Sequence, residues 1–356
     1  MLVLPDDVTE AASTSGTKTL ATDMKGLFED PRHSDVTIRV GKEEFSAHKA
    51  ILACRSKVFR AMFESGMKEC QENTLDLVGM EHSTARSMLE YIYTGSLGKL
   101  SMEEAFDLYV AADRYNLQDI KDGCKECILK DMSADQACEV AAFANLHSDE
   151  VLLMASCLAL KNNFQQVAFD EPHRSTAGAM TLATDMKTLF EDPLHSDVTL
   201  RVGQEEFSAH KAILSSRSKV FRDIFESGAN ECQENTLDLV GMKHSTARSM
   251  LKYIYTGCLD KLEIEEAFDL YTAADKYDLQ KLKSWCKKCI LNDMSADDVC
   301  EVAVFATLHS DEDLLMASCC TLKSNLHRVL NTEKWSNFAK QNRDLYSELI
   351  EKVVLM

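Results

Sequence analysis

Glu43-Glu-Phe-Ser-Ala-His-Lys-Ala-Ile-Leu52 decides the fold of this chain, because the same ten residues return at Glu205–Leu214. Sliding the sequence against itself by 162 residues aligns Leu20–Asn163 with Leu182–Asn325 without a gap, and 111 of the 144 positions are identical. Identity this close at one long offset is typical of a duplicated domain and not of a solenoid. We therefore expect two copies of one module.

The residues on either side of this stretch predict a mixed module of short strands and helices. Val36, Ile38 and Val40 alternate with polar residues and run into Gly41-Lys42, which predicts a β-hairpin whose second strand passes through Phe45. The further elements expected are helices over Ala47–Cys54 and Ser56–Phe63, a strand through Leu75 and Leu77, a helix over Ser83–Tyr93 closed by Gly95, a helix opened by a capping box at Ser101 and Glu104, and a helix capped by Ser148. Three strands cannot bury a core alone, so the fold class is α+β with helices covering the sheet.

Composition limits the partners and the compartment. The 356 residues are 45% apolar and 27% charged, which suits globular domains, and the net charge of -19 disfavours nucleic acid and anionic membranes as partners. Thirteen cysteines, with Cys319 and Cys320 adjacent, fit reduced thiols better than a disulfide framework. The N-terminal residues do not resemble a signal peptide and no apolar run approaches a membrane span. We expect the protein in the nucleus, the cytoplasm or both.

Two CxxC pairs, Cys124-Lys-Glu-Cys127 and Cys286-Lys-Lys-Cys289, are the strongest candidates for chemistry. Four thiolates can hold a zinc ion, but these pairs are equivalent positions of two repeats, 162 residues apart. Each pair lies in a helix-like stretch, where its i, i+3 spacing joins an apolar face. We favour buried core thiols and keep metal or redox use as the alternative.

Serine, histidine and aspartate occur together at His33-Ser-Asp35 and His147-Ser-Asp149, but neighbours in sequence rarely converge as a catalytic triad does. His48 has no carboxylate or cysteine at ligand spacing, which favours a structural or solvated histidine. Nucleotide-binding and metalloprotease motifs are absent from the sequence. We expect no catalytic residue, no metal and no cofactor, and the protein is not expected to be an enzyme.

Several motifs together resemble a BTB/POZ domain, and more narrowly the speckle-type POZ proteins of the TD and POZ domain-containing family. They are the Gly hairpin followed by Phe45–Leu52, Arg55-Ser-Lys-Val-Phe59, Met62-Phe63, Tyr91-Ile-Tyr-Thr-Gly95 and Ala111-Ala-Asp-Arg-Tyr115. Ser133–Leu160 is similar to the 3-box at the start of the BACK region, and the second copy continues through Leu330-Asn-Thr-Glu-Lys-Trp335. The resemblance covers nearly all of residues 20–356.

The resemblance implies an order of segments along the chain. They are a flexible tail (residues 1–19), a first BTB/POZ domain (20–131), a 3-box or partial BACK segment (132–165), a linker (166–181), a second BTB/POZ domain (182–293) and a BACK-like helical region (294–356). Speckle-type proteins carry a substrate-reading MATH domain before the BTB domain, and here only nineteen residues precede the first copy. Family members meet as dimers of two chains, whereas this chain carries both copies, so the domains are expected to pair within one chain or with other BTB/POZ chains.

For the dimer face, the resemblance points to the segment before the first strand. Leu20, Met24 and Leu27 recur at i, i+4 and i+7 as one helical stripe. The full set of expected interface residues is Leu20, Met24, Leu27 and Ile51, with Leu182, Met186, Leu189 and Ile213 in the second copy. The alternative is that each stripe packs only on its own domain.

For cullin-3 binding, the resemblance points to a hydrophobic-x-Glu element, here Met67-Lys68-Glu69 and, in the second copy, Ala229-Asn230-Glu231. Replacing methionine by alanine at a well-packed contact loses on the order of 1 to 3 kcal/mol. The first copy therefore looks the better cullin binder, unless Met67 packs locally. We expect cullin contacts from Met67, Glu69 and Glu231.

The leading functional hypothesis is an adaptor of a cullin-3 RING ubiquitin ligase that serves proteasomal degradation of an unknown substrate protein. The rival is a non-catalytic scaffold or dominant-negative partner that pairs with full-length speckle-type chains through the two stripes. A catalytic role for the CxxC pairs comes third, and stoichiometric zinc would favour it.

Overall fold

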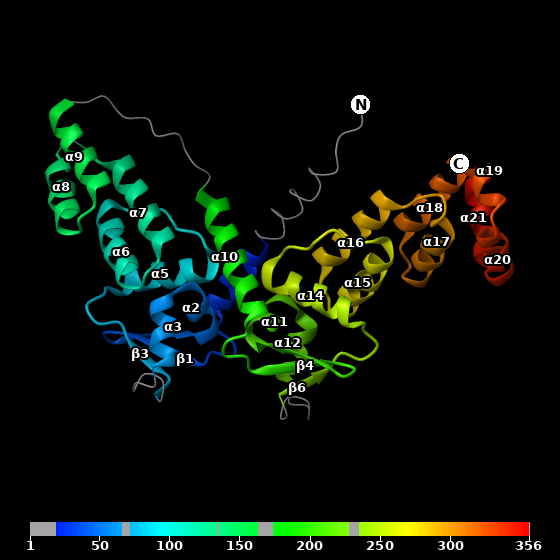
Figure 1. Cartoon of the computed structure of the whole chain (residues 1–356), viewed down its shortest axis with the longest axis horizontal. Coiled ribbons are helices and arrows are strands. Elements are labelled where there is room, and N and C mark those ends of the chain that lie inside the picture. Colours follow the sequence, from blue (N-terminus) through cyan, green and yellow to red (C-terminus); the bar gives the residue numbers. More distant parts are fainter. Residues whose placement is uncertain (1–18, 66–71, 134, 163–173, 228–234, 356) are drawn as a thin grey trace. The chain divides into compact units, whose positions relative to one another are not determined.

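The computed structural model describes residues 19–65, 72–133, 135–162, 174–227 and 235–355 (Figure 1). The chain divides into two compact units. One consists of Met1–Leu239 with Leu251–Leu259, and the other of Val240–Met250 with Asp260–Met356. The first unit thus contains both β-sheets, and each unit is described by itself.

The sheet of the first repeat has three short strands in the order β2-β1-β3. They are β1 (Val36–Val40), β2 (Glu43–Ala47) and β3 (Thr74–Asp76). Strands β1 and β2 form the predicted antiparallel hairpin, and Gly41 at its turn has φ of 64°, a conformation that glycine adopts at little cost. Strand β3 returns parallel to β1. Alternate residues of β1, among them Ile38, are buried, so one face of the sheet points into the core.

Seven helices in the described ranges follow or interrupt this sheet. They are α2 (Lys49–Arg55), α3 (Lys57–Glu64), α5 (His82–Thr94), α6 (Met102–Arg114), α7 (Gln118–Asp131), α8 (Ala137–Leu146) and α9 (Glu150–Asn162). A further helix over residues 19–29 precedes the sheet. Gly95 closes α5 in the left-handed conformation and Ser101 opens α6 with a complete capping box, which confirms both predictions.

The predicted cap at Ser148 is wrong by one residue. Ser148 has φ of 53°, and the side chain of Asp149 instead accepts the backbone N–H of Leu152 at 3.2 Å. The tight left-handed turn at Ser148 ends α8 and moves the first cap position of α9 to the aspartate.

The second repeat forms the same elements 162 residues later. They are α10 (Arg174–Glu191), β4 (Val198–Val202), β5 (Glu205–Ala209), α11 (Lys211–Arg217), α12 (Lys219–Glu226), β6 (Thr236–Asp238), α14 (His244–Thr256), α15 (Ile264–Lys276), α16 (Gln280–Asp293), α17 (Val299–Leu308) and α18 (Glu312–Ser324). Its sheet has the matching order β5-β4-β6.

Three helices at the C-terminus have no counterpart in the described part of the first repeat. They are α19 (Leu326–Leu330), α20 (Glu333–Gln341) and α21 (Arg343–Leu355). Helix α21 packs on α17 and α18, and α20 packs on α17. None of the helices in the described ranges has both the length and the apolar character needed to span a membrane.

Candidate pairing interface between the two repeats

Helix α10, at the start of the second repeat, packs on α2 and α5 of the first repeat (Figure 1). All three helices belong to the first compact unit. Helix α10 carries the predicted stripe of Leu182, Met186 and Leu189, and α2 carries Ile51. These four side chains are at most 1% exposed. The stripe of the second repeat therefore lies on a helix that contacts the first repeat.

The equivalent residues of the first repeat are buried in the same way. Leu20, Met24 and Leu27 of the helix over residues 19–29 are at most 4% exposed, and Ile213 of α11 is buried. These residues would be buried if they formed a pairing face, and equally if each stripe packed only on its own domain. The role of the eight stripe residues in pairing stays a prediction.

Two reciprocal ion pairs join the repeats and were not anticipated from the sequence. Arg55 of α2 pairs with Asp185 of α10, and Arg217 of α11 pairs with Asp23 of the helix over residues 19–29. Adding 162 to Arg55 gives Arg217, and subtracting 162 from Asp185 gives Asp23, so the second contact is the first with the repeats exchanged. This reciprocity is the mark of a two-fold related interface.

The two guanidinium groups are almost completely removed from solvent. The Arg55 and Arg217 side chains are 3% and 2% exposed, and they stack over the rings of Tyr91 and Tyr253 at 5.4 Å each. A charge buried this deeply is tolerated only when it is paired, because its desolvation is costly. Burial also raises the pKa of Asp185 although Arg55 opposes the shift. Each repeat thus depends on the other to neutralise its buried arginine.

A signal for these pairs was present in the sequence. Asp23 lies between Leu20 and Met24, on the same face of the helix as the apolar stripe, and the second repeat keeps the aspartate as Asp185. A carboxylate within an apolar stripe implies a buried cation opposite it. The identity of that cation could not be read from the sequence, since Arg55 and Asp185 are 130 positions apart.

Aromatic contacts repeat the same reciprocal pattern. His33 meets the ring of Phe225 edge-on with 6.2 Å between centroids, and Phe63 meets His195 at the same distance. Burial lowers the pKa of both histidines. The interface therefore favours neutral imidazoles at these two positions.

His48 holds the segment that carries His33. Its Nε2 lies 2.7 Å from the carbonyl oxygen of Arg32, and because a carbonyl only accepts, Nε2 carries the proton. Its Nδ1 then accepts from the hydroxyl of Tyr93 at 2.8 Å, and that oxygen accepts the backbone N–H of His48 at 3.0 Å. His210 makes the same three bonds with Tyr255 and the carbonyl of Leu194. Burial lowers the pKa of both histidines, which act as structural residues.

One contact breaks the two-fold relation. Arg32 of the first repeat pairs with Glu226 of the second, but the second repeat has Leu194 where the first has Arg32. The reciprocal partner, Glu64, therefore meets no arginine at that position. The two repeats are closely similar but not interchangeable at this interface.

The predicted cullin residues Met67, Glu69 and Glu231 lie outside the described residues. The CxxC cysteines lie in α7 and α16, with Cys124 and Cys286 fully buried, and Cys127 Sγ donates to the carbonyl of Leu100 at 3.6 Å. Burial raises the pKa of Cys289 to about 11. Across the described ranges, no three or more of His, Cys, Asp and Glu are grouped so as to hold a metal ion.

Comparisons with known proteins agree with the duplicated module. A curated relative, the TD and POZ domain-containing protein 4 of Mus musculus, is 34% identical over 179 residues, which cover 50% of this chain and 47% of the relative. The chain thus spans about half the length of that relative. Two solved structures are also similar. The BTB domain of zebrafish PATZ1 has 26% identity and a TM-score of 0.27, covering 36% of this chain and 96% of that domain. The BTB domain of human gigaxonin has 26% identity and a TM-score of 0.28, covering 35% of this chain and 98% of that domain.

The sequence model of the BTB/POZ domain matches twice, at residues 24–131 and 186–294. These matches together cover more than half of the chain and confirm the expected family and the α+β fold class. The chain belongs to the BTB/POZ domain family.

Proposed function

We propose that this chain is a non-catalytic adaptor of a cullin-3 ubiquitin ligase in the nucleus or cytoplasm, with its two BTB/POZ domains paired within one polypeptide. The family match and the TD and POZ domain-containing relative support a protein-interaction adaptor. The observation that carries the internal pairing is the reciprocal set of ion pairs, Arg55 with Asp185 and Arg217 with Asp23.

Internal pairing has a direct consequence for assembly. Each buried arginine finds its carboxylate within the same chain, so a second chain is not needed to neutralise it. The purified protein should therefore have the mass of one chain, 39.9 kDa, at micromolar concentration. Light scattering after gel filtration measures this mass, and a stable species of twice the mass would show pairing between chains.

Cullin binding is assigned to the first repeat because it has Met67 and Glu69, where the second has Ala229 and Glu231. A methionine can fill an apolar pocket on the cullin, whereas alanine leaves most of it empty. We expect one cullin N-terminal domain per chain. The substrate protein would bind elsewhere on the chain.

The test is calorimetric titration of the full chain with the cullin N-terminal domain. Met67→Ala should weaken binding about tenfold or more, as loss of an anchoring side chain does. Met316→Ala, which truncates a methionine that is 43% exposed on α18 of the second repeat, is the matched control and should leave the affinity nearly unchanged. Absence of binding at micromolar concentration would refute the cullin assignment.

The rival function, a scaffold that pairs with other speckle-type chains, would require the internal interface to open. Mixing the chain with a labelled single BTB/POZ domain distinguishes the two. Subunit exchange into mixed oligomers would favour the scaffold, and its absence would favour the internally paired adaptor.

A further inference from the structure

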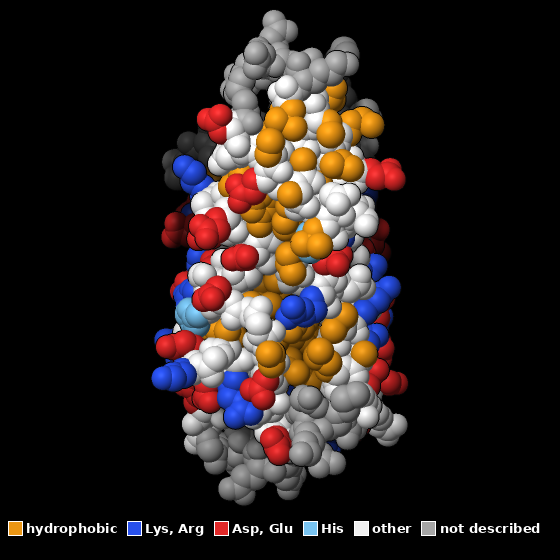
Figure 2. Space-filling view, turned by 90° about the vertical axis from the view of Figure 1, so that its left-hand side faces the viewer, with side chains coloured by type: hydrophobic (Ala, Val, Ile, Leu, Met, Phe, Trp, Pro, Cys, Tyr) orange, Lys and Arg blue, Asp and Glu red, His pale blue; other side chains and the backbone are white. Residues whose placement is uncertain are grey.

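Helices α8 and α9 of the first repeat correspond to α17 and α18 of the second, yet among the described residues further helices cover only the second pair. In the second repeat α20 and α21 pack on α17, and α21 also packs on α18. Figure 2 faces the side of the first repeat on which α8 and α9 lie, and apolar side chains gather there. The two repeats thus offer a direct comparison of one face in a covered and an uncovered state.

The comparison identifies which side chains the cover removes from solvent. Leu322 is fully buried in the second repeat, whereas its counterpart Leu160 is 48% exposed. Cys319 is buried and its counterpart Cys157 is exposed. Cys300 and Cys138 show the same difference. The residue types are identical at all three positions, so the lower exposure in the second repeat follows from the helices that pack on α17 and α18 there.

The second repeat also shows what kind of segment fits such a face. Helix α20 contributes Trp335 and Phe338, and α21 contributes Leu349, all at most 5% exposed. Two basic residues flank these anchors. Lys334 pairs with Glu301 at 3.0 Å, and Arg328 pairs with Asp297 at 2.7 Å. The cover is an amphipathic helical segment with aromatic anchors and a basic rim.

The first repeat keeps the acidic half of this arrangement. Glu139 corresponds to Glu301 and Asp135 to Asp297, both are exposed, and neither has an ion-pair partner within the described part of the chain. An apolar centre beside two free carboxylates is complementary to a basic amphipathic helix. A second copy of the same face would instead place like charges opposite one another, which disfavours self-association through it.

We propose that the α8–α9 face of the first repeat is a docking site for a helical segment of a partner protein. The segment would carry a tryptophan or phenylalanine that packs near Cys157 and Leu160, and lysine or arginine side chains that pair with Asp135 and Glu139. The site does not depend on cullin binding, which is assigned to Met67 and Glu69. It gives the adaptor a defined surface for a second protein.

A peptide of residues 326–355 of this chain is the probe, because it has the chemistry that covers the equivalent face. A fluorescent form of the peptide is titrated with the full chain and followed by anisotropy. Saturable 1:1 binding is expected, and Leu160→Glu in the chain should abolish it. Binding should also slow alkylation of Cys157 and leave the rate at Cys320, which is exposed on α18, unchanged.

A charge exchange makes the test specific. Glu139→Lys in the chain should weaken binding of the wild-type peptide about tenfold. Lys334→Glu in the peptide should then restore the lost affinity for the Glu139→Lys chain. Glu301→Lys in the chain is the matched control, since the peptide could also displace its own counterpart from the second repeat. Binding that responds to Glu301→Lys and not to Glu139→Lys would overturn the proposal.

Two further results would overturn it. One is the absence of saturable binding up to about 100 μM. A dissociation constant above that concentration would be weaker than that of a specific helix-in-groove contact. The other is a concentration-dependent doubling of the chain's mass that Leu160→Glu removes, because the occupant would then be a second copy of this chain.

Discussion

Arg55 lies buried against the carboxylate of Asp185, 130 residues further along the chain, and Arg217 and Asp23 repeat this contact with the two copies exchanged. A pair of this kind holds two repeats together only as long as both partners are present. Removing one partner leaves a buried charge without compensation, which costs more than the pair contributed.

Arg55→Ala should therefore lower the free energy of unfolding by about 3 kcal/mol, the lower end of the range for a broken buried pair, because Asp185 is 29% exposed. Urea denaturation followed by circular dichroism measures the change. Arg39→Ala is the matched control. Arg39 pairs with Asp76 at 2.8 Å on the surface, and its loss should cost less than about 1 kcal/mol. Equal costs for the two variants would contradict the internal interface.

Acidification should destabilise the protein through its buried histidines. Burial lowers the pKa of His33, His48, His195 and His210 in the folded chain, so the unfolded chain binds protons first as the pH falls. Stability is then fully present above the ordinary histidine pKa of about 6.5 and is lost as the pH falls from there towards the folded-state values. The slope should approach about 1.4 kcal/mol per pH unit for each histidine that titrates in this window.

Urea denaturation at pH 7.5, 6.5 and 5.5 measures this loss. The double variant His48→Gln, His210→Gln removes the two histidines that bond to Tyr93 and Tyr255 and should flatten the pH dependence. An unchanged slope in the double variant would show that other groups cause the acid sensitivity.

Asp149 should prove one of the costliest polar positions in the first repeat. It accepts from Tyr109 Oη at 2.7 Å and from Lys125 Nζ at 2.8 Å, and it caps α9. Burial opposes its ionisation, but the bonds from Lys125 and Tyr109 prevail and hold the pKa of Asp149 below its ordinary value. Asp149→Ala removes the acceptor of the Tyr109 hydroxyl and leaves Lys125 only the longer pair with Asp122 at 3.9 Å, so it should cost about 3 kcal/mol.

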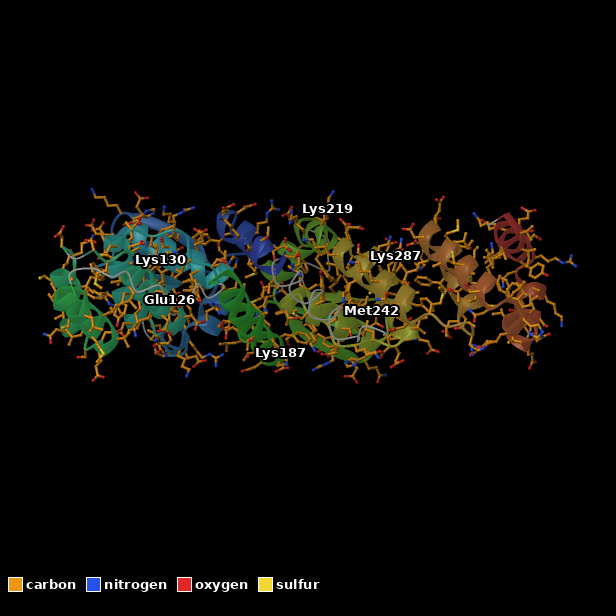
Figure 3. The ribbon with its side chains drawn as sticks, turned by 90° about the horizontal axis from the view of Figure 1, so that it is seen from above. Glu126, Lys130, Lys187, Lys219, Met242 and Lys287 are labelled. Atoms are coloured by element: carbon orange, nitrogen blue, oxygen red, sulfur yellow. The ribbon has the colours of Figure 1, made fainter. Side chains whose placement is uncertain are left out.

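The control for Asp149 comes from the second repeat. There Lys287, labelled in Figure 3, pairs with Asp311 and also with Asp313, whose side chain is 80% exposed. Asp313→Ala should change the free energy of unfolding by less than about 1 kcal/mol. A cost for Asp149→Ala no larger than this would mean that its network contributes little.

The sequence was sufficient for the local elements of the fold. The hairpin at Gly41, the left-handed close at Gly95 and the capping box at Ser101 follow from residue preferences that act over a few positions. The cap at Asp149 was missed because the left-handed conformation of Ser148 ends one helix before the next begins. That conformation has no strong signal in a serine.

The contacts between the repeats could not be predicted from residue preferences that act over a few positions. The stripe of Leu20, Met24 and Leu27 could be recognised from its helical spacing, but the arginine facing Asp185 comes from a distant segment and depends on how two domains pack. The exposure of Leu160 was also unpredictable, since Leu322 has the same spacing and is buried. What covers a face is decided by elements outside it.

Thiol reactivity should separate the cysteines by their place in the fold. Cys124 and Cys286 are fully buried on α7 and α16, whereas Cys138 and Cys157 are exposed on α8 and α9. The thiolate is the reactive form, and burial raises the pKa of Cys286 and so suppresses it further. In native protein at pH 7.5, Ellman's reagent should react quickly with Cys138 and Cys157. It should react with Cys124 and Cys286 only after the protein unfolds. Mass spectrometry of the peptides that carry the mixed disulfide with the reagent assigns each rate. Fast labelling of Cys124, or stoichiometric zinc released on its modification, would show instead that the CxxC pairs are functional and not part of the core.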